Sequence, residues 1–341
     1  MSLTKKQNLL FIILLLVMVF LFLVNISLGS VSIPLKEVVN GLLSQEMSKE
    51  SWEIILWNFR FPKAITAILV GIGLSMSGLL MQTLFRNPLS GPYVLGLSSG
   101  ASLGVAFVIL GTGFLPLFIS SFFLSNHGLI LASSLGSLLV FMAVLLVSKK
   151  LKDTMAILIV GLMFGSFTSA IVSVLSYFTT AEKLQKFTFW SMGSISNLSW
   201  NEISLLSVFV IIGIGISFMV IKPLNALLLG EKYAQSIGIN YKKTRFLIII
   251  ATSILAGSIT AFAGPIAFIG LAVPHMAKLL FQTSNHFVLF WSTLLLGAIV
   301  MLCCDTIAQV PGNDITLPIN AITSVMGAPV VIWLLVRKKR F

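Results

Sequence analysis

The sequence predicts an all-α integral membrane protein with about ten transmembrane helices and both termini in the cytoplasm. Of its 341 residues 57% are hydrophobic and only 9% are charged, whereas soluble domains carry about 45–50% and 25%. Apolar runs of about 20 residues, the length that crosses a bilayer, recur along the chain. A net charge of +12 in such a protein reflects basic cytoplasmic loops, so no nucleic-acid partner is expected.

Ten apolar runs separated by polar breaks mark the expected helices. They fall at about 8–28, 64–85, 93–111, 128–148, 154–178, 202–221, 246–263, 266–281, 287–309 and 317–336. The first follows Lys5 and Lys6 and lacks a small-residue cleavage pattern, which favours a retained anchor over a signal peptide. The eighth is short, follows Gly264-Pro265 and contains Pro274, which is consistent with a half-helix or re-entrant segment enclosed by protein.

The distribution of Lys and Arg sets the orientation. With the N-terminus inside, sixteen of the 22 basic residues fall on the cytoplasmic side, as the positive-inside rule requires. Ten crossings then return the basic C-terminus to the cytoplasm. The chain is expected to be a single transmembrane domain, 1–341, with an outer segment at 29–63 and a cytosolic segment at 222–245.

Several classes of chemistry have no candidate residues in the sequence. It holds no G-x-x-x-x-G-K-[ST] nucleotide loop and no H-E-x-x-H, so neither ATP hydrolysis nor another catalytic activity is expected. Cys303 and Cys304 are adjacent, which indicates neither a disulfide framework nor a metal site. Asp305 is the sole acid in the interior of an apolar run, whereas ion-coupled carriers depend on buried ionisable groups. An ion-coupled secondary transporter is therefore the less favoured alternative.

Two expected helices carry stripes of small or polar residues at helical spacing. In the fifth helix the stripe is Ser166, Ser169, Ser173, Ser176 and Thr180. In the second helix it is Gly71, Ser75, Gly78 and Gln82. Spacings of three and four place each set on one helical face. Such a face either packs closely against another helix or lines a pathway that neither binds nor repels a large solute.

The cytosolic segment 222–245 is too elaborate for a simple connection. Its apolar residues have helical spacing, interrupted by Gly230 and Gly238, which predicts two short helices at the surface. They form either a basic interfacial helix on anionic lipid or a docking platform for a cytosolic partner. The outer segment ends in Arg60-Phe61-Pro62-Lys63, where flanking bases ordinarily anchor a helix at the membrane surface.

The ordered motifs of the chain resemble those of a known transporter family. The run from Arg60 to Ala101 reads RFPKAITAILVGIGLSMSGLLMQTLFRNPLSGPYVLGLSSGA. It is followed in order by WSMGS at 190–194, LGEKYAQSIGI at 229–239, GPIAFIGLAVPH at 264–275, Asp305 and GAPV at 327–330. Together they resemble the FecCD-type permeases of ABC importers for iron-siderophores, haem and vitamin B12. The resemblance implies a BtuC-like fold in a bacterial inner membrane.

The resemblance also implies partners and site residues. A second permease copy or a sister permease would complete the pore, cytosolic ATPase subunits would bind the ATP, and an extracytoplasmic solute-binding protein would deliver the solute. The expected ATPase-docking residues are Leu229, Gly230, Ala234 and Gly238. Arg60 and Lys63 are expected to receive acidic residues of the binding protein. The expected cytoplasmic gate comprises Asn87, Leu89, Thr154 and Met155.

The chain departs from the family pattern at two outer positions. Lys63 and Gln309 stand where relatives commonly have arginine. Lysine keeps the charge but lacks the planar fork that grips a carboxylate, so whether docking is weakened stays open. An iron-siderophore is the expected solute, with vitamin B12 and haem as alternatives.

Overall fold

The computed structural model describes residues 4–43, 45, 47–111, 124–151, 154–310, 312 and 315–337, and within them it is helical with no strand. The chain folds into two compact units. Unit 1 comprises residues 1–79, 194–208 and 267–341, and unit 2 comprises 80–193 and 209–266. Two of the long helices begin in one unit and end in the other, so the division follows the packing rather than the order of the chain.

The ten predicted apolar runs all coincide with helices, which confirms the all-α membrane class. Seven helices among the described residues are long and apolar enough to cross a membrane. They are α1 (Lys5–Ser27), α4 (Phe61–Leu84), α7 (Asn126–Lys150), α8 (Thr154–Tyr177), α10 (Trp200–Met219), α13 (Tyr241–Ala263) and α15 (His286–Ala308). Three are shorter in their apolar part, namely α5 (Leu97–Ile109), α14 (Ile269–Phe281) and α16 (Ile319–Arg337).

The short helices depart from simple crossings. Helices α5 and α14 have 13 residues each and are about 20 Å long, less than the ~30 Å hydrocarbon core. Helix α14 also contains Pro274, and the amide of Ala267 just before it donates to Asn320 Oδ1 at 2.9 Å. A half-helix within a membrane protein requires that side chains form hydrogen bonds with the backbone groups that lie outside the helix.

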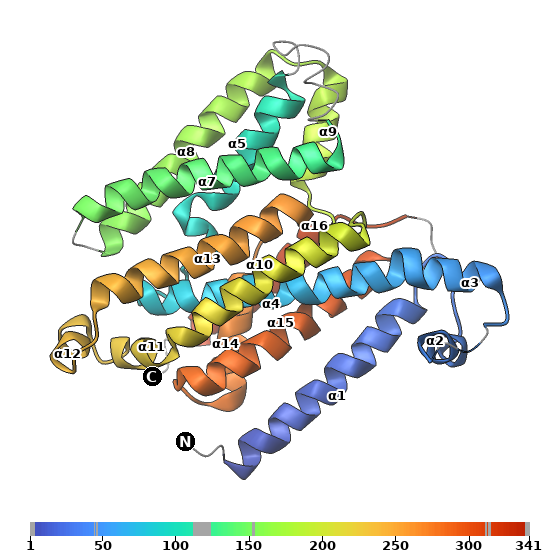
Figure 1. Ribbon diagram of the computed structural model, residues 1–341, viewed down its shortest axis with the longest axis horizontal. Helices are drawn as coiled ribbons and strands as arrows, with labels where there is room; N and C mark the ends of the chain where they lie inside the picture. Colours follow the sequence, from blue (N-terminus) through green and yellow to red (C-terminus); the bar gives the residue numbers. More distant parts are fainter. Residues whose placement is uncertain are drawn as a thin grey trace. The chain divides into compact units, whose positions relative to one another are not determined.

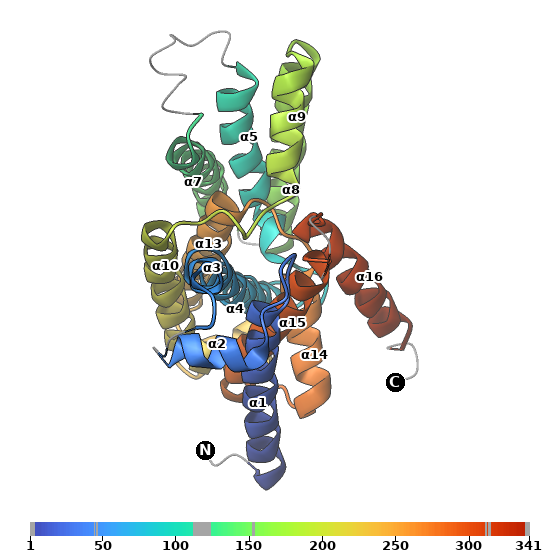
Figure 2. The same ribbon diagram turned by 90° about the vertical axis from the view of Figure 1, so that its right-hand side faces the viewer.

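In unit 1, α1 lies along α15, and α15 packs on both α14 and α16 (Figures 1 and 2). Segment 29–63, the predicted outer segment, contains helices that the sequence did not predict: α2 (Leu35–Leu42), α3 (Glu50–Ile55) and the π-helical turn η1 (Leu56–Arg60). The last two run without a break into α4 (Figure 1). A π-helical turn inside a longer helix shifts the helical register locally and is frequent at functional sites.

In unit 2, α5 packs against both α7 and α8, and α13 packs on α5 and α7 (Figure 2). The core between these helices is apolar and is centred on Val105, Ala106, Ile109 and Leu110. Side chains of α8 and of α9 (Ala181–Ser191) cover it, including Trp190. The turn η2 (Pro92–Leu95) leads into α5 and lies against α8.

Burial differs strongly among the long helices. In the most apolar stretch of the helix that includes α4, 78% of the residues are buried, against 17% for both α1 and α8. An apolar surface of this size in a membrane protein faces lipid or another subunit. Helix α4 is therefore internal, whereas α1 and α8 are peripheral within this chain.

Candidate functional site

Segment 222–245, predicted to be cytosolic and here named the coupling segment, contains the two predicted short helices. They are α11 (Ile221–Leu227) and α12 (Glu231–Ser236). One side of the segment is buried, with Ala234 fully enclosed. The other side exposes large apolar side chains, and these are Leu228, Leu229, Tyr233 and Ile237. An apolar patch of this kind marks an interaction surface.

The glycines of the coupling segment are required by the backbone. Gly230 has φ +122° and Gly238 has φ +86°, values that side chains with a Cβ rarely adopt. A Cβ at Gly238 would meet nothing within 4 Å, and one at Gly230 would come no closer than 3.8 Å to Arg86 Nη2. The surface around both glycines is therefore open, which leaves room for a partner.

Residues 86–90, here named the gate turn because the gate is predicted at Asn87 and Leu89, follow the end of α4. Asn87 Oδ1 accepts from the amide of Leu89 at 2.9 Å, and the amide of Ser90 donates to the Asn87 carbonyl at 3.0 Å. These bonds rigidify the turn, while the Leu89 side chain stays exposed. Of the other two predicted gate residues, Thr154 begins α8, with its side chain outside the described residues, and Met155 is exposed.

The predicted serine face of α8 borders an open hollow of about 580 Å³. Ser166, Ser169 and Ser173 line it, together with Tyr93, Gly96, Ser99 and residues of the same helix. Ser166 Oγ donates to the Leu162 carbonyl at 3.2 Å, and Ser173 Oγ donates to the Ser169 carbonyl at 3.0 Å. Both hydroxyl hydrogens are thus bonded to carbonyls of α8, so the hydroxyl oxygens can still accept hydrogen bonds from a molecule in the hollow. Ser176 is not among the lining residues.

The stripe on α4 is buried, in contrast to the serine face. Gly71 lies against the backbone of Gly297 in α15, and Gly78 lies against that of Gly270 in α14. Ser75 Oγ donates to its own helix at Gly71 (2.6 Å) and lies 3.1 Å from the Thr293 carbonyl in α15. Residues 71–78 therefore serve close helix packing. Gln82, the last member, is also buried.

Arg60, one predicted docking residue, is engaged within unit 1. Its guanidinium donates to the carbonyls of Ile26 at 3.0 Å and Ser27 at 2.7 Å, and also to that of Val31. Only 9% of the residue is exposed. Arg60 thereby fixes the chain between α1 and α2, and its role in receiving a binding protein stays a prediction.

Lys63, the second predicted docking residue, forms a salt bridge with Asp305. Lys63 Nζ lies 3.0 Å from Asp305 Oδ1, and the two side chains are 13% and 1% exposed. Asp305 Oδ2 accepts from Asn25 Nδ2 at 2.8 Å and from Gln309 Nε2 at 2.9 Å. The acid within the apolar run therefore has a nearly buried partner, as intramembrane charges normally do. This cluster joins α1, α4 and α15.

The sequence did not identify two further residues of interest. Tyr93 lies in the hollow beside α8, and its hydroxyl donates to the Ile266 carbonyl at 2.9 Å. Arg86 begins the gate turn and donates from Nη2 to the Leu227 carbonyl at 2.9 Å. Both lie in the motif run between Arg60 and Ala101, but only the fold reveals their partners.

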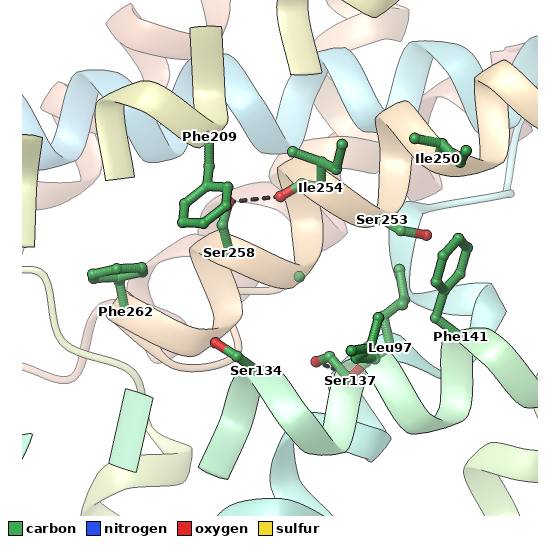
Figure 3. Close-up of a pocket in the computed structure, with 12 residues that line it drawn as sticks. Leu97, Ser134, Ser137, Phe141, Phe209, Ile250, Ser253, Ile254, Ser258 and Phe262 are labelled. Carbon is green, nitrogen blue, oxygen red and sulfur yellow. Dashed lines mark hydrogen bonds between the residues drawn. The ribbon is translucent and has the colours of Figure 1, made fainter. Parts of the chain in front are cut away.

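A second cavity, of about 260 Å³, contains none of the predicted site residues. It lies among α5, α7, α10 and α13, and Figure 3 shows Phe141, Phe209 and Phe262 around it. The hydroxyl of Ser258 donates to the Ile254 carbonyl at 2.6 Å, and that of Ser137 donates to the Leu97 carbonyl at 3.0 Å. The cavity wall is mostly apolar, unlike the serine face.

Comparisons with known proteins agree with the motifs. The sequence model of the FecCD transport family matches residues 15–337. The BtuC permease of the vitamin B12 import system of Salmonella typhi is 36% identical over 289 residues, covering 84% of this chain and 85% of that protein. The BtuC permease of Citrobacter koseri is 35% identical, with 84% of each chain covered.

Solved structures support the same fold. A structure described as an inward-facing conformation of a metal-chelate type ABC transporter superposes with a TM-score of 0.83. The two chains are 29% identical, and the match covers 97% of this chain and 99% of that one. A chain of PsaBC from Streptococcus pneumoniae, solved in complex with Fab, shares the fold at a TM-score of 0.52 and 12% identity, covering 88% of this chain and 95% of that one. The chain belongs to the FecCD transport family and is a multi-pass inner-membrane permease of the BtuC type from an ABC importer.

Proposed function

We propose that this permease forms half of a pathway that imports a metal chelate, driven by ATP that separate cytosolic subunits hydrolyse. The hollow along α8 carries the proposal. Its lining consists of serines, glycines, Tyr93, Leu162 and Ala170, with no charged residue among them. A neutral face that offers weak hydrogen-bond acceptors allows a bulky solute to pass without being held.

Exposed surfaces on single helices and segments support the proposed partners. Helix α8 is largely exposed, so a second permease copy or a sister permease facing it would close the pathway. The exposed apolar side of the coupling segment fits a cytosolic ATPase, and the positions of Gly230 and Gly238 leave the surface beside it open. An extracytoplasmic binding protein would deliver the solute at the outer segment.

Two solutes fit the proposal. The resemblance to the family favours an iron-siderophore. Vitamin B12 is favoured by the relatives at 35–36% identity, which belong to vitamin B12 import systems. Both are metal ions enclosed in a large organic ligand, and the metal-chelate neighbour agrees with that shared class.

The test is uptake by lipid vesicles that contain the purified permease with its ATPase and binding protein. Radiolabelled cyanocobalamin and a panel of ferric siderophores are supplied separately, with ATP or with a non-hydrolysable analogue inside the vesicles. ATP-dependent accumulation of one chelate is expected. Accumulation that needs neither ATP nor the partners would contradict the proposal, and so would a complete set of partners that moves no metal chelate.

A further inference from the structure

Arg86 lies where the coupling segment and the gate turn meet. Its guanidinium Nη2 donates to the Leu227 carbonyl at 2.9 Å. The amide of Gly230 donates to the same carbonyl at 3.2 Å. One backbone oxygen at the end of α11 therefore binds both the first residue of the gate turn and a glycine predicted to dock the ATPase.

The charge of Arg86 suits this position. The last carbonyls of a helix lack partners within it and carry partial negative charge. A guanidinium meets this need with a charge-assisted hydrogen bond, which is stronger than a neutral one. Leu227 itself is buried, whereas Leu228 and Leu229 beside it are exposed. The segment thus has an exposed side that a partner can contact and a buried side that is bonded to Arg86.

The backbone of Arg86 is also unusual. Its φ is +47°, in the left-handed region that glycine normally occupies after the end of a helix. Arginine at such a position costs conformational energy. A glycine would end helix α4 there at a lower conformational cost, so the backbone conformation does not explain why this residue is an arginine. The side-chain hydrogen bond from Arg86 to α11 does explain it.

We propose that Arg86 is a positioning residue that transmits movement of the coupling segment to the gate turn. Movement of the exposed side of the coupling segment would displace the Leu227 carbonyl, and the guanidinium bonded to it would carry that displacement to Asn87 and Leu89. The inference rests on the proposed function, because it requires that an ATPase docks on the segment.

The experiment reports the state of the gate by chemical labelling and needs no transported solute. Cys303 and Cys304 are the only cysteines in the chain, and both are replaced by alanine. Leu89→Cys then provides a single thiol in the full complex with the ATPase. The rate of reaction with a water-soluble maleimide is measured without nucleotide and with ATP plus vanadate. With Arg86 present, nucleotide should change the rate roughly fivefold or more, as allosteric coupling typically does.

Arg86→Gly is the decisive variant. Glycine relieves the left-handed backbone, so the permease should be at least as stable, yet the ratio of the two labelling rates should fall to about one. Arg86→Lys keeps a donor and a charge, so part of the ratio should return. Co-purification of the ATPase measures docking separately.

The outcomes distinguish the role of Arg86 from the proposed function of the permease. If Arg86→Gly keeps the full nucleotide response, the role of Arg86 is wrong while the proposed function stands. If Arg86→Gly loses the ATPase on purification, the role is also wrong, because Arg86 would then shape the docking surface itself. If the chain with Arg86 shows no nucleotide response while the ATPase is bound, the gate turn does not follow the coupling segment and the role of Arg86 is wrong, whereas the uptake experiment decides the proposed function.

Discussion

Helices α4 and α8 carry similar stripes of small residues but use them in opposite ways. The α4 stripe approaches the backbones of α14 and α15 through Gly71 and Gly78. The α8 stripe consists of serines and borders an open hollow. Glycine has no side chain to keep two helices apart, whereas a row of serines offers oxygen atoms to whatever lies outside. The contrast shows that the residue type, more than the spacing, distinguishes a stripe that packs against other helices from one that borders a hollow.

The same contrast extends to the polar groups of the two helices. Lys63 of α4 is bound to a buried acid, and Ser75 reaches a carbonyl of α15. On α8, Ser166 and Ser173 bond within their own helix. Polar groups on α4 therefore hold helices together, whereas those on α8 contribute little to stability. Substitutions on the two helices should differ accordingly.

The largest effect is expected at the Lys63–Asp305 pair. Lys63→Met leaves a carboxylate that is 1% exposed without its cation, which should lower the free energy of unfolding by about 3–5 kcal/mol. Replacing both residues by apolar ones, Lys63→Met with Asp305→Leu, should restore most of the loss, because no buried charge then remains. Unfolding in mixed micelles as dodecyl sulfate is added measures the change.

A second lysine of the outer segment is the matched control. Lys49 lies 4.8 Å from the ring centre of Trp52, and such exposed contacts are worth about 0.5–1 kcal/mol. Lys49→Met should therefore have a small effect. Equal losses for Lys49→Met and Lys63→Met would mean that the salt bridge with Asp305 contributes nothing specific.

A smaller effect is expected where α4 meets α14. A Cβ on Gly78 would overlap the backbone of Gly270, so Gly78→Ala should force the two helices apart and cost about 1–3 kcal/mol. Gly215 in α10 is the control, because a Cβ there meets nothing within 4 Å. Gly215→Ala should be neutral or stabilising by about 0.5–1 kcal/mol, as alanine favours a helix. A stable Gly78→Ala protein would contradict the close packing of the α4 stripe.

Much of the fold was predictable because long apolar runs are a strong signal. All ten runs contain helices. The prediction that Gly230 and Gly238 interrupt the short helices of the coupling segment was also correct, because α11 ends before Gly230 and α12 ends before Gly238. The short helices α2, α3 and α9 were missed, since 6 to 11 residues hold too few turns for a clear apolar period.

The site was less predictable than the fold, because its contacts join distant parts of the chain. Asn25 and Asp305 are 280 residues apart, and Arg86 and Leu227 are 141 apart. The sequence marked Asp305 as exceptional but offered no means of choosing Lys63 as its partner. Nor could spacing alone separate the two stripes, because close approach of backbones is a property of the packed structure.

The smallest effect on stability, and the sharpest test of the comparison, is expected on α8. Ser173→Val removes a hydroxyl that bonds only its own helix among the contacts described for it, so the free energy of unfolding should change by no more than about 0.5 kcal/mol. The added methyl groups narrow the hollow and remove an oxygen acceptor, so ATP-dependent uptake should slow severalfold. Ser204→Val on α10 is the control, because Ser204 is exposed and bonds its own helix but does not line the hollow. Equal uptake by both variants would mean that the serine face of α8 is not part of the pathway, whereas a large loss of stability in Ser173→Val would mean that it packs as α4 does.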